Sequence, residues 1–298
     1  MTTSKWLYKN IPSLSGKIVA ISGSTGGLGQ ALCEHLATLG ASLLLLDRNE
    51  QKAQALIDKL RKKIPSLRAS YIYLDLSDID CVAEVTKYLC KNTPDHIIFN
   101  AGIYHVPRYT CKCGYNNIFQ VNFLSPYYMA RKLKPYIQGK GGNIVAVGSI
   151  AHNYSKIDID DIDFSTRAKS SKIYGNSKRF LMFSLYGLFG EEAGLSIVHP
   201  GITFTNITAH YPKVIFALIK HPMKIIFMSP KKASLSILQG LNAPCETNTW
   251  IGPRVFDVWG VPKKKLLKTC SFEESRQICE IAETAYEKMD AIINKSRD

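Results

Sequence analysis

The chain has 298 residues, of which 46% are hydrophobic, so it can bury the core of one large α/β domain or two small ones. Its formal net charge of +14 comes mostly from dispersed lysines that form no recognised nucleic-acid-binding module, so we expect no nucleic-acid partner. No run of 18 apolar residues occurs, and residues 1–15 lack the apolar core of a secretory signal, so we expect a cytoplasmic protein without a membrane span.

Short apolar runs alternate with longer helical patterns through most of the chain. After an N-terminal arm over residues 1–15, strands are expected at Lys17–Ser22, Ser42–Asp47, Ser70–Asp75, His96–Asn100, Asn143–Ser149, Leu195–His199 and Thr249–Gly252. Helices are expected near Leu28–Leu39, Gln51–Lys62, Ile79–Lys91, Tyr115–Ile137, Lys172–Gly194 and Lys231–Leu241. This alternation predicts an α/β fold, a Rossmann-like doubly wound parallel sheet in a single domain over residues 16–262.

The last segment, residues 263–298, is expected to form a helical extension of this domain. Ser271 and Glu274 have the spacing of a capping box, which predicts a helix from there towards Ile293. We expect that helix to dock on the body of the domain.

The cysteines give little evidence of a disulfide framework or a metal site. Eight of them are scattered along the chain, which favours a reducing compartment. Only Cys111 and Cys113 stand close together, and no second ligand pair follows at zinc-like spacing. We therefore expect no metal.

The first predicted strand runs directly into a glycine-rich turn, Ser22–Gly29, and then into a helical pattern. This context predicts a dinucleotide site: Gly23 permits the tight turn, Gly27 the close approach of backbone to a diphosphate, and Gly29 the packing of helix on strand. Ser24 and Leu28 are expected to contact the cofactor as well. The alternative is a turn with no ligand. A P-loop is excluded because no Gly-Lys-Ser/Thr follows.

Two charged residues at the end of the second strand give opposing signals about the cofactor. Asp47 can accept hydrogen bonds from the adenosine ribose hydroxyls, which favours NAD. Arg48 could instead pair with a 2′-phosphate, which favours NADP. Because a carboxylate repels a phosphate, we expect NAD(H) to be favoured over NADP(H).

The next strand ends carry further candidate contacts with the cofactor. Asp75 and Leu76 follow the third strand, and Asn100, Ala101 and Gly102 follow the fourth. Parallel strands deliver their carboxyl ends to one edge of the sheet, where ligands bind. The alternative is ordinary loop chemistry, since Asp, Asn and Gly favour turns.

A tyrosine and a lysine at helical spacing form the candidate catalytic pair. Tyr174 and Lys178 lie on one face of the predicted helix, where an ammonium group can stabilise a phenolate and lower its pKa. Ser149 closes the fifth strand at the same edge as the glycine turn. Asn122 lies inside a long helical pattern, where asparagine is a poor helix former. As alternatives, Asn122 could cap a kink and Ser149 could be a turn residue.

Together these motifs resemble the short-chain dehydrogenase/reductase family, in family order from residue 17 to about 205. The matching positions are Ser22–Gly29, Asp75, Asn100–Gly102, Asn122, Ser149, Tyr174, Lys178, Pro200, Gly201 and Thr205. Ser22 stands where the family more often has threonine, and Phe99 where it often has a second asparagine. The spacing of twenty-five residues from Ser149 to Tyr174 is similar to that of retinol dehydrogenase-like members.

The resemblance implies a role for each matching residue. Tyr174 would be the general acid/base, and Lys178 would bind the nicotinamide ribose and lower the tyrosine pKa. Ser149 would bind the substrate oxygen, and Asn122 would hold a water in the proton relay. The carboxamide would be fixed by four further residues: Pro200, Gly201, Thr203 and Thr205.

The segment after Thr205 is the expected substrate lid, near 203–230, with its apolar and basic stretch at Ile207–Met228. Such a lid can close on an apolar substrate, rest on an anionic membrane surface as a peripheral contact, or pack on its own domain. We expect a hydrophobic small-molecule substrate that is steroid-like, retinoid-like or another lipid.

These observations predict an enzyme, an NAD(P)-dependent oxidoreductase that interconverts a secondary alcohol and a ketone or aldehyde. The alternative is a non-catalytic dinucleotide-binding redox sensor or scaffold, but that class does not need the set formed by Asn122, Ser149, Tyr174 and Lys178. A sugar-nucleotide epimerase fits less well, because such proteins usually have a different glycine spacing. The resemblance also implies a homo-oligomer, although the C-terminal segment could block one interface.

Overall fold

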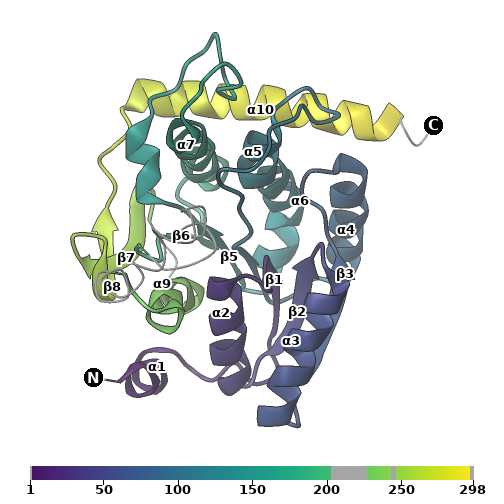
Figure 1. Cartoon of the computed structure of the whole chain (residues 1–298), viewed down its shortest axis with the longest axis vertical. Coiled ribbons are helices and arrows are strands. Elements are labelled where there is room, and N and C mark those ends of the chain that lie inside the picture. The colour runs from purple at the N-terminus through teal and green to yellow at the C-terminus, as the bar shows by residue number, and fades with distance from the viewer. Residues whose placement is uncertain (1, 203–226, 243–245, 296–298) are drawn as a thin grey trace, which may run out of the picture.

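The computed structural model of the chain describes residues 2–202, 227–242 and 246–295. Its centre is an eight-stranded sheet in the order β3-β2-β1-β4-β5-β6-β7-β8 (Figure 1). The strands are β1 (Ile18–Ser22), β2 (Ser42–Asp47), β3 (Ala69–Tyr73), β4 (His96–Phe99), β5 (Asn143–Val147), β6 (Leu195–Val198), β7 (Thr249–Val255) and β8 (Trp259–Leu266). Strands β1 to β7 are parallel, and β8 is antiparallel to β7. The predicted doubly wound sheet in one domain is confirmed.

Helices cover both faces of the sheet (Figure 1). One face carries α1 (Thr3–Asn10), α2 (Gly27–Thr38), α3 (Glu50–Lys63) and α9 (Pro230–Asn242). The other carries α4 (Ile79–Lys91), α5 (Asn117–Phe119), the π-helical turn η1 (Gln120–Leu124), α6 (Ser125–Gly139), α7 (Ser170–Phe189) and α10 (Phe272–Lys295). A 3-10 helix, η2 (Ile150–Tyr154), follows β5.

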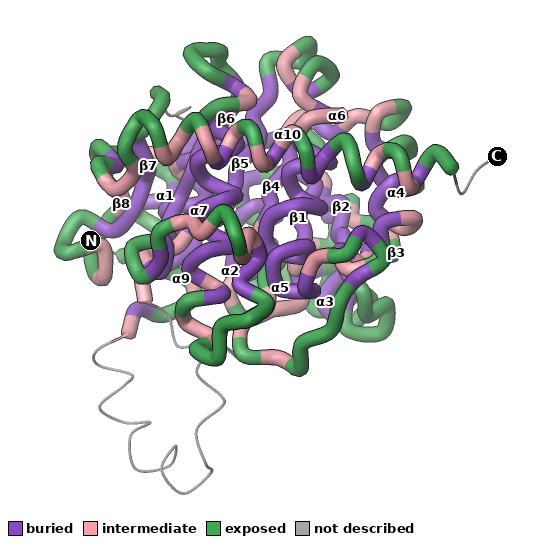
Figure 2. Tube along the Cα trace, turned by 90° about the horizontal axis from the view of Figure 1, so that it is seen from above, coloured by how far each residue is buried: buried purple, intermediate pink, exposed green. Residues whose placement is uncertain are grey.

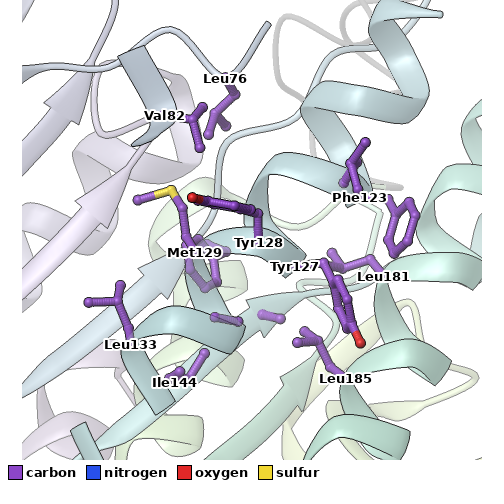
Figure 3. Close-up of a cluster of buried hydrophobic side chains, with 14 of the residues drawn as sticks. Leu76, Val82, Phe123, Tyr127, Tyr128, Met129, Leu133, Ile144, Leu181 and Leu185 are labelled. Carbon is purple, nitrogen blue, oxygen red and sulfur yellow. The ribbon is translucent and has the colours of Figure 1, made fainter. Parts of the chain in front are cut away.

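Side chains of the central strands alternate between two hydrophobic cores. In β1, Ala20 faces the core under α4, α6 and α7, while Val19 and Ile21 face the core under α2, α3 and α9. Both cores are closed to solvent, so the sheet is buried in the middle of the molecule (Figure 2). Figure 3 shows the first core, in which Met129 and Leu133 of α6 lie near Ile144 of β5.

The structure differs from the predicted elements in three places. Residues 3–10, expected as an arm, form α1, which buries Trp6 and Leu7. The single helix expected over Tyr115–Ile137 is divided by the π-helical turn η1. Strand β8 was not predicted, and the expected domain boundary at residue 263 falls inside it.

The expected C-terminal helix is present as α10. The Ser271 hydroxyl accepts the N–H of Glu274 at 3.1 Å, as the capping-box spacing predicts. The helix packs across α7, where a Cβ on Gly187 would lie 2.2 Å from the Cys279 sulfur. Glycine at position 187 therefore permits the close approach of these two helices.

Candidate active site

A cavity of about 980 Å³ opens at the carboxyl edge of the sheet. It lies where the strand order reverses, because β2 and β3 follow on one side of β1 while β4 to β7 continue on the other. Its walls come from the segments that follow β1 to β6 and from the first turns of α7. A crevice at this position is where open α/β sheets bind their ligands.

The glycine-rich turn between β1 and α2 forms one wall of the cavity. Gly23 has a φ of +69°, and a Cβ there would lie 2.7 Å from the Cα of Ala101. A Cβ on Gly29 would lie 2.3 Å from the Gly23 carbonyl oxygen, so both positions require glycine. Helix α2 begins at Gly27, which lines the cavity. The free N–H groups and positive dipole end of α2 therefore suit a diphosphate.

Most of the predicted contacts in this turn line the cavity: Gly23, Gly27, Leu28 and Gly29. Thr25 and Gly26 line it as well, although the sequence analysis did not single them out. Ser24, which was expected to contact the cofactor, is instead fully buried and does not line the cavity. Its hydroxyl donates to Asp47, so its side chain holds the turn in place.

Asp47 ends β2 and lines the cavity, although only 5% of it is exposed. Its carboxylate accepts four hydrogen bonds from the N–H and hydroxyl groups of Ser24 and Thr25, three of them 2.9 to 3.3 Å long. Burial raises the pKa of Asp47, and these bonds act in the opposite direction. A carboxylate has about four lone-pair sites, so those of Asp47 are engaged by the glycine turn.

The other predicted nucleotide contacts surround this turn: Arg48, Asp75, Leu76, Asn100, Ala101 and Gly102 all line the cavity. The Arg48 guanidinium lies 3.9 Å from the Asp75 carboxylate, and its side chain is 60% exposed. The Asn100 amide donates to the carbonyls of Ser22 and Gly23 at 3.1 and 2.9 Å. Asn100 thus fixes the glycine turn from the neighbouring strand.

Tyr174 and Lys178 lie one turn apart near the start of α7, and both line the cavity. The Ser149 hydroxyl, just after β5, also lines the cavity and is close enough to the Tyr174 phenol to lower its pKa. Lys178 Nζ donates to the Val147 carbonyl at 2.7 Å and lies 5.8 Å from the centre of the Tyr174 ring. The Tyr104 ring packs edge-on against Tyr174. The fold therefore brings the predicted serine, tyrosine and lysine together at one wall.

Burial dominates the electrostatics of this pair. It raises the pKa of Tyr174 to about 12, against the opposing effect of Ser149, and it lowers the pKa of Lys178 to about 8. Both shifts arise because burial disfavours a charged group. The expected lowering of the tyrosine pKa by Lys178 is not found, because burial, Ser149 and Tyr104 are what shift it. The Tyr174 phenol is neutral at pH 7 and able to donate a proton.

Asn122 lies in η1, the π-helical turn, and is completely buried outside the cavity wall. Its amide accepts the N–H of Ile103 at 2.8 Å and donates to the Ile103 carbonyl at 3.0 Å and the Ser177 hydroxyl at 3.1 Å. A Cβ on Gly102 would lie 3.3 Å from the Asn122 oxygen and 3.6 Å from Lys178 Nζ. Asn122 therefore joins the segment after β4 to α7, and the π-helical turn is how the helix accommodates it.

Two residues expected around the carboxamide, Pro200 and Gly201, follow β6 and line the cavity. Thr203 and Thr205 lie outside the described residues, as does the expected lid up to residue 226. At its end, Phe227 lines the cavity and Met228 is buried.

Several residues of the cavity wall were missed by the sequence analysis. His199 follows β6, its ring nitrogen donates to the Asp257 carbonyl at 3.0 Å, and burial lowers its pKa to about 4. Tyr104 and Tyr154 also line the cavity. The position of His199 at a strand end was a usable signal, whereas the two tyrosines follow no motif.

Two expected absences concern metal and membrane. Within the described residues, no three His, Cys, Asp or Glu side chains gather as a metal site, and Cys113 instead donates to the Gln120 amide oxygen at 2.6 Å. Over the same parts of the chain, no helix combines the length and the apolar character needed to cross a bilayer.

Comparison with known sequences identifies the family of this chain. A family model described as short chain dehydrogenase matches residues 17–159. A dehydrogenase/reductase SDR family member of Arabidopsis thaliana is 30% identical over 80% of this chain and 68% of that protein. Human polyprenol dehydrogenase is 24% identical over 67% of this chain and 64% of its own length. Human retinol dehydrogenase 13 is 25% identical over 66% of this chain and 62% of its own length.

Solved structures share the fold. A protein from Mycobacterium paratuberculosis has a TM-score of 0.72 at 20% identity and covers 99% of this chain and 97% of its own. A Burkholderia phymatum short-chain dehydrogenase in complex with NAD has a TM-score of 0.56 at 19% identity, over 76% and 86%. L-sorbose reductase from Gluconobacter frateurii, complexed with NADPH and L-sorbose, has a TM-score of 0.57 at 19% identity, over 78% and 91%.

Proposed function

The chain belongs to the short-chain dehydrogenase/reductase family of oxidoreductases, and we propose that it interconverts an alcohol and the corresponding ketone or aldehyde with a nicotinamide dinucleotide. The observation that carries this proposal is the meeting of Ser149, Tyr174 and Lys178 at the wall of a cavity that also contains the glycine-rich turn. A non-catalytic sensor needs the turn but has no use for a buried phenol beside a serine hydroxyl.

The side chains have separate roles in this proposal. Tyr174 donates its proton to the carbonyl oxygen during reduction and takes it back during oxidation, while Ser149 hydrogen-bonds the same oxygen. Lys178 binds the nicotinamide ribose, and Asn122 holds the segment after β4 in place and supports a water of the proton relay. The dinucleotide, when bound, supplies or accepts the hydride.

We propose that the remaining dinucleotide contacts are divided by position. The glycine turn binds the diphosphate. The segments after β3 and β4 bind the adenosine half, and the segment after β6 binds the carboxamide through Pro200, Gly201, Thr203 and Thr205.

NAD(H) is the dinucleotide that we propose as preferred. The carboxylate of Asp47 lines the cavity at the end of β2, where it would repel a 2′-phosphate, and Arg48 already faces the carboxylate of Asp75. Because Asp47 also anchors Ser24 and Thr25, it contributes to binding either dinucleotide. The preference is therefore a ratio of affinities, which titration of the purified chain with NADH and with NADPH measures.

We propose a hydrophobic substrate. The cavity wall near Tyr174 contains Ile103, Tyr104, Ile150 and Phe227, which offer apolar surface. Two of the related proteins are named for polyprenol and retinol, both long apolar alcohols. Apolar surface in a pocket favours such substrates by excluding water.

A series of methyl ketones of increasing chain length tests this proposal. With NADH in excess, kcat/KM should rise about fourfold for each added methylene until the cavity is filled, because each buried methylene contributes about 0.8 kcal/mol. Keto acids of the same lengths serve as matched polar controls. Equal kcat/KM along the series, or a preference for the keto acids, contradicts a hydrophobic substrate.

A homo-oligomer remains a prediction. Helix α10 covers the faces of α6 and α7, where Tyr127 and Arg131 contact Glu283 and Tyr128 is hydrogen-bonded to Asp290. Any contact between copies through those helices would therefore have to include α10.

A further inference from the structure

The hairpin that joins β7 to β8 has a turn that its sequence does not favour. The Val258 N–H donates to the Val255 carbonyl at 3.0 Å and closes the turn, and its two central residues, Phe256 and Asp257, have φ of +50° and +57°. Turns of this kind normally use Asn and Gly, because a bulky side chain is strained in left-handed backbone. Phe256 is thus held in a conformation that other residues adopt more easily.

The Phe256 side chain is also exposed to solvent. Phe256 is 84% exposed, and Val255, Trp259 and Val261 beside it are 38% to 43% exposed. Backbone strain and solvent exposure both disfavour phenylalanine here, and nothing in the turn itself offsets them. An exposed apolar group that is retained at a strained position points to a use outside the chain.

Hydrogen bonds hold the turn that carries Phe256 in place. Lys265 Nζ donates to the Asp257 carboxylate at 2.9 Å and to the Pro253 carbonyl at 2.7 Å. His199 contacts the Asp257 carbonyl at 3.0 Å. These bonds tie the tip of the hairpin to β6 and β8, so little conformational entropy is lost when the tip binds a partner.

Positive charge flanks the apolar tip. Residues 249–268 contain five Lys or Arg residues and one acidic residue, Asp257. Lys264 pairs with Glu246 and Lys265 with Asp257. Arg254 of β7 and Lys263 of β8 are exposed, and no carboxylate in the described parts of the chain lies within ion-pair distance of either. The surface therefore combines an apolar point with unpaired cations.

The tip also lies beside the cavity. Since β7 is parallel to β6, its carboxyl end reaches the same edge of the sheet as the site residues. A Cβ on Gly201, in the cavity wall, would lie 2.9 Å from both the Val258 carbonyl oxygen and the Pro253 ring. In Figure 1 the hairpin is at the margin of the molecule, beyond the last parallel strand.

We propose that this hairpin tip docks on an anionic lipid bilayer. Phe256 inserts among the headgroups, where aromatic rings are stable, and Arg254 and Lys263 contact lipid phosphates. A protein partner fits less well, because a stable interface needs roughly 1,000 Å² or more and the tip offers few apolar side chains. Docking would turn the cavity towards the bilayer, so that a hydrophobic substrate enters from lipid. This last consequence rests on the proposed function, whereas docking does not.

Co-sedimentation of the purified full chain with lipid vesicles tests the proposal without substrate or cofactor. Binding is expected to vesicles that contain about one third phosphatidylserine, to be weak on pure phosphatidylcholine, and to fall with added salt. Phe256→Asn should lower the partition coefficient about tenfold, because it removes the apolar contact. Asparagine tolerates left-handed backbone, so this variant should keep or raise the melting temperature.

Phe272→Asn is the matched control, because Phe272 is 85% exposed and begins α10, beyond the far end of β8. It should bind vesicles as the wild type does, while Arg254→Gln and Lys263→Gln should each weaken binding about fivefold. Absence of wild-type binding to anionic vesicles, or equal binding by Phe256→Asn, overturns the proposal. A wild-type dimer that Phe256→Asn converts to monomer would identify a second copy as the occupant. Failure of ketone reduction would overturn the proposed function and leave the vesicle result standing.

Discussion

Replacing Tyr174 with phenylalanine is expected to lower kcat by about a thousandfold, because it removes the hydroxyl that donates the proton to the carbonyl oxygen. Burial raises the pKa of this hydroxyl to about 12 against the opposing effect of Ser149, so at neutral pH it is a proton donor for ketone reduction. The ring itself remains, and with it the packing against Tyr104. Dinucleotide affinity should therefore stay within about threefold of the wild type.

Tyr104→Phe is the matched control, since Tyr104 lines the same cavity and packs edge-on against the Tyr174 ring. It should retain kcat within a few fold. The measurement is the steady-state rate of dinucleotide oxidation with a saturating methyl ketone, together with dinucleotide binding to each variant. A kcat for Tyr174→Phe within tenfold of the wild type contradicts the assignment of Tyr174.

Replacing Arg179 with methionine is expected to lower the free energy of unfolding by about 3 kcal/mol or more, because it leaves a partly buried carboxylate without its partner. The Arg179 side chain is 2% exposed and forms a two-pronged pair with Glu274, at 2.7 and 2.6 Å. It also donates to the carbonyls of Thr269 and His152. This one side chain thus ties α7 to the segment that leads into α10.

The network around Arg179 continues to the active site. His152 contacts the Ser149 carbonyl at 2.6 Å through one ring nitrogen and the Thr269 hydroxyl at 2.7 Å through the other. Loss of Arg179 should therefore also loosen the segment that carries Ser149. Arg276→Met is the matched control, since Arg276 is an exposed arginine that pairs with Glu273 and Glu280 on the surface of α10, and it should leave the free energy of unfolding nearly unchanged.

Urea unfolding of the two arginine variants, repeated across pH, measures these effects. Burial alone would raise the pKa of Glu274, but the hydrogen bonds and charge of Arg179 hold it below its usual value. A depressed carboxylate pKa stabilises the fold above the unfolded pKa, and that stability is lost as pH falls through the folded pKa. The difference between wild type and Arg179→Met should therefore shrink in acid below about pH 4. A loss under 1 kcal/mol at pH 7 would contradict the account of this pair.

The sequence predicted the elements whose signals are local. Strand β2 and helix α4 have the predicted bounds, because an apolar run ending in Asp47 and an amphipathic pattern capped by Asp78 are complete within their own segments. Helix α1 and strand β8 were missed because each depends on a distant partner. Trp6 and Leu7 are buried only because α9 packs on them, and the lysine-rich β8 pairs only because β7 precedes it.

The sequence predicted which residues meet in the candidate site, but not the hydrogen bonds that they form there. Strand ends and helical spacing correctly brought Ser149, Tyr174 and Lys178 to one cavity. The hydrogen bonds of Asp47 to Ser24 and Thr25 were not predictable, because they depend on how a turn twenty-two residues earlier folds over the end of β2. The effect of burial on the pKa values of Tyr174 and Lys178 likewise follows from packing that no motif encodes.

Titration of the purified chain with NADH and with NADPH tests whether the cavity binds a nicotinamide dinucleotide. Binding is detected as energy transfer from protein tryptophan to the nicotinamide ring. The account predicts saturable transfer with both dinucleotides and tighter binding of NADH, because the Asp47 carboxylate lines the cavity at the end of β2. Tighter binding of NADPH would show that Arg48 decides the preference. Absence of transfer with either dinucleotide up to millimolar concentration would contradict the assignment of this cavity as a nicotinamide dinucleotide site.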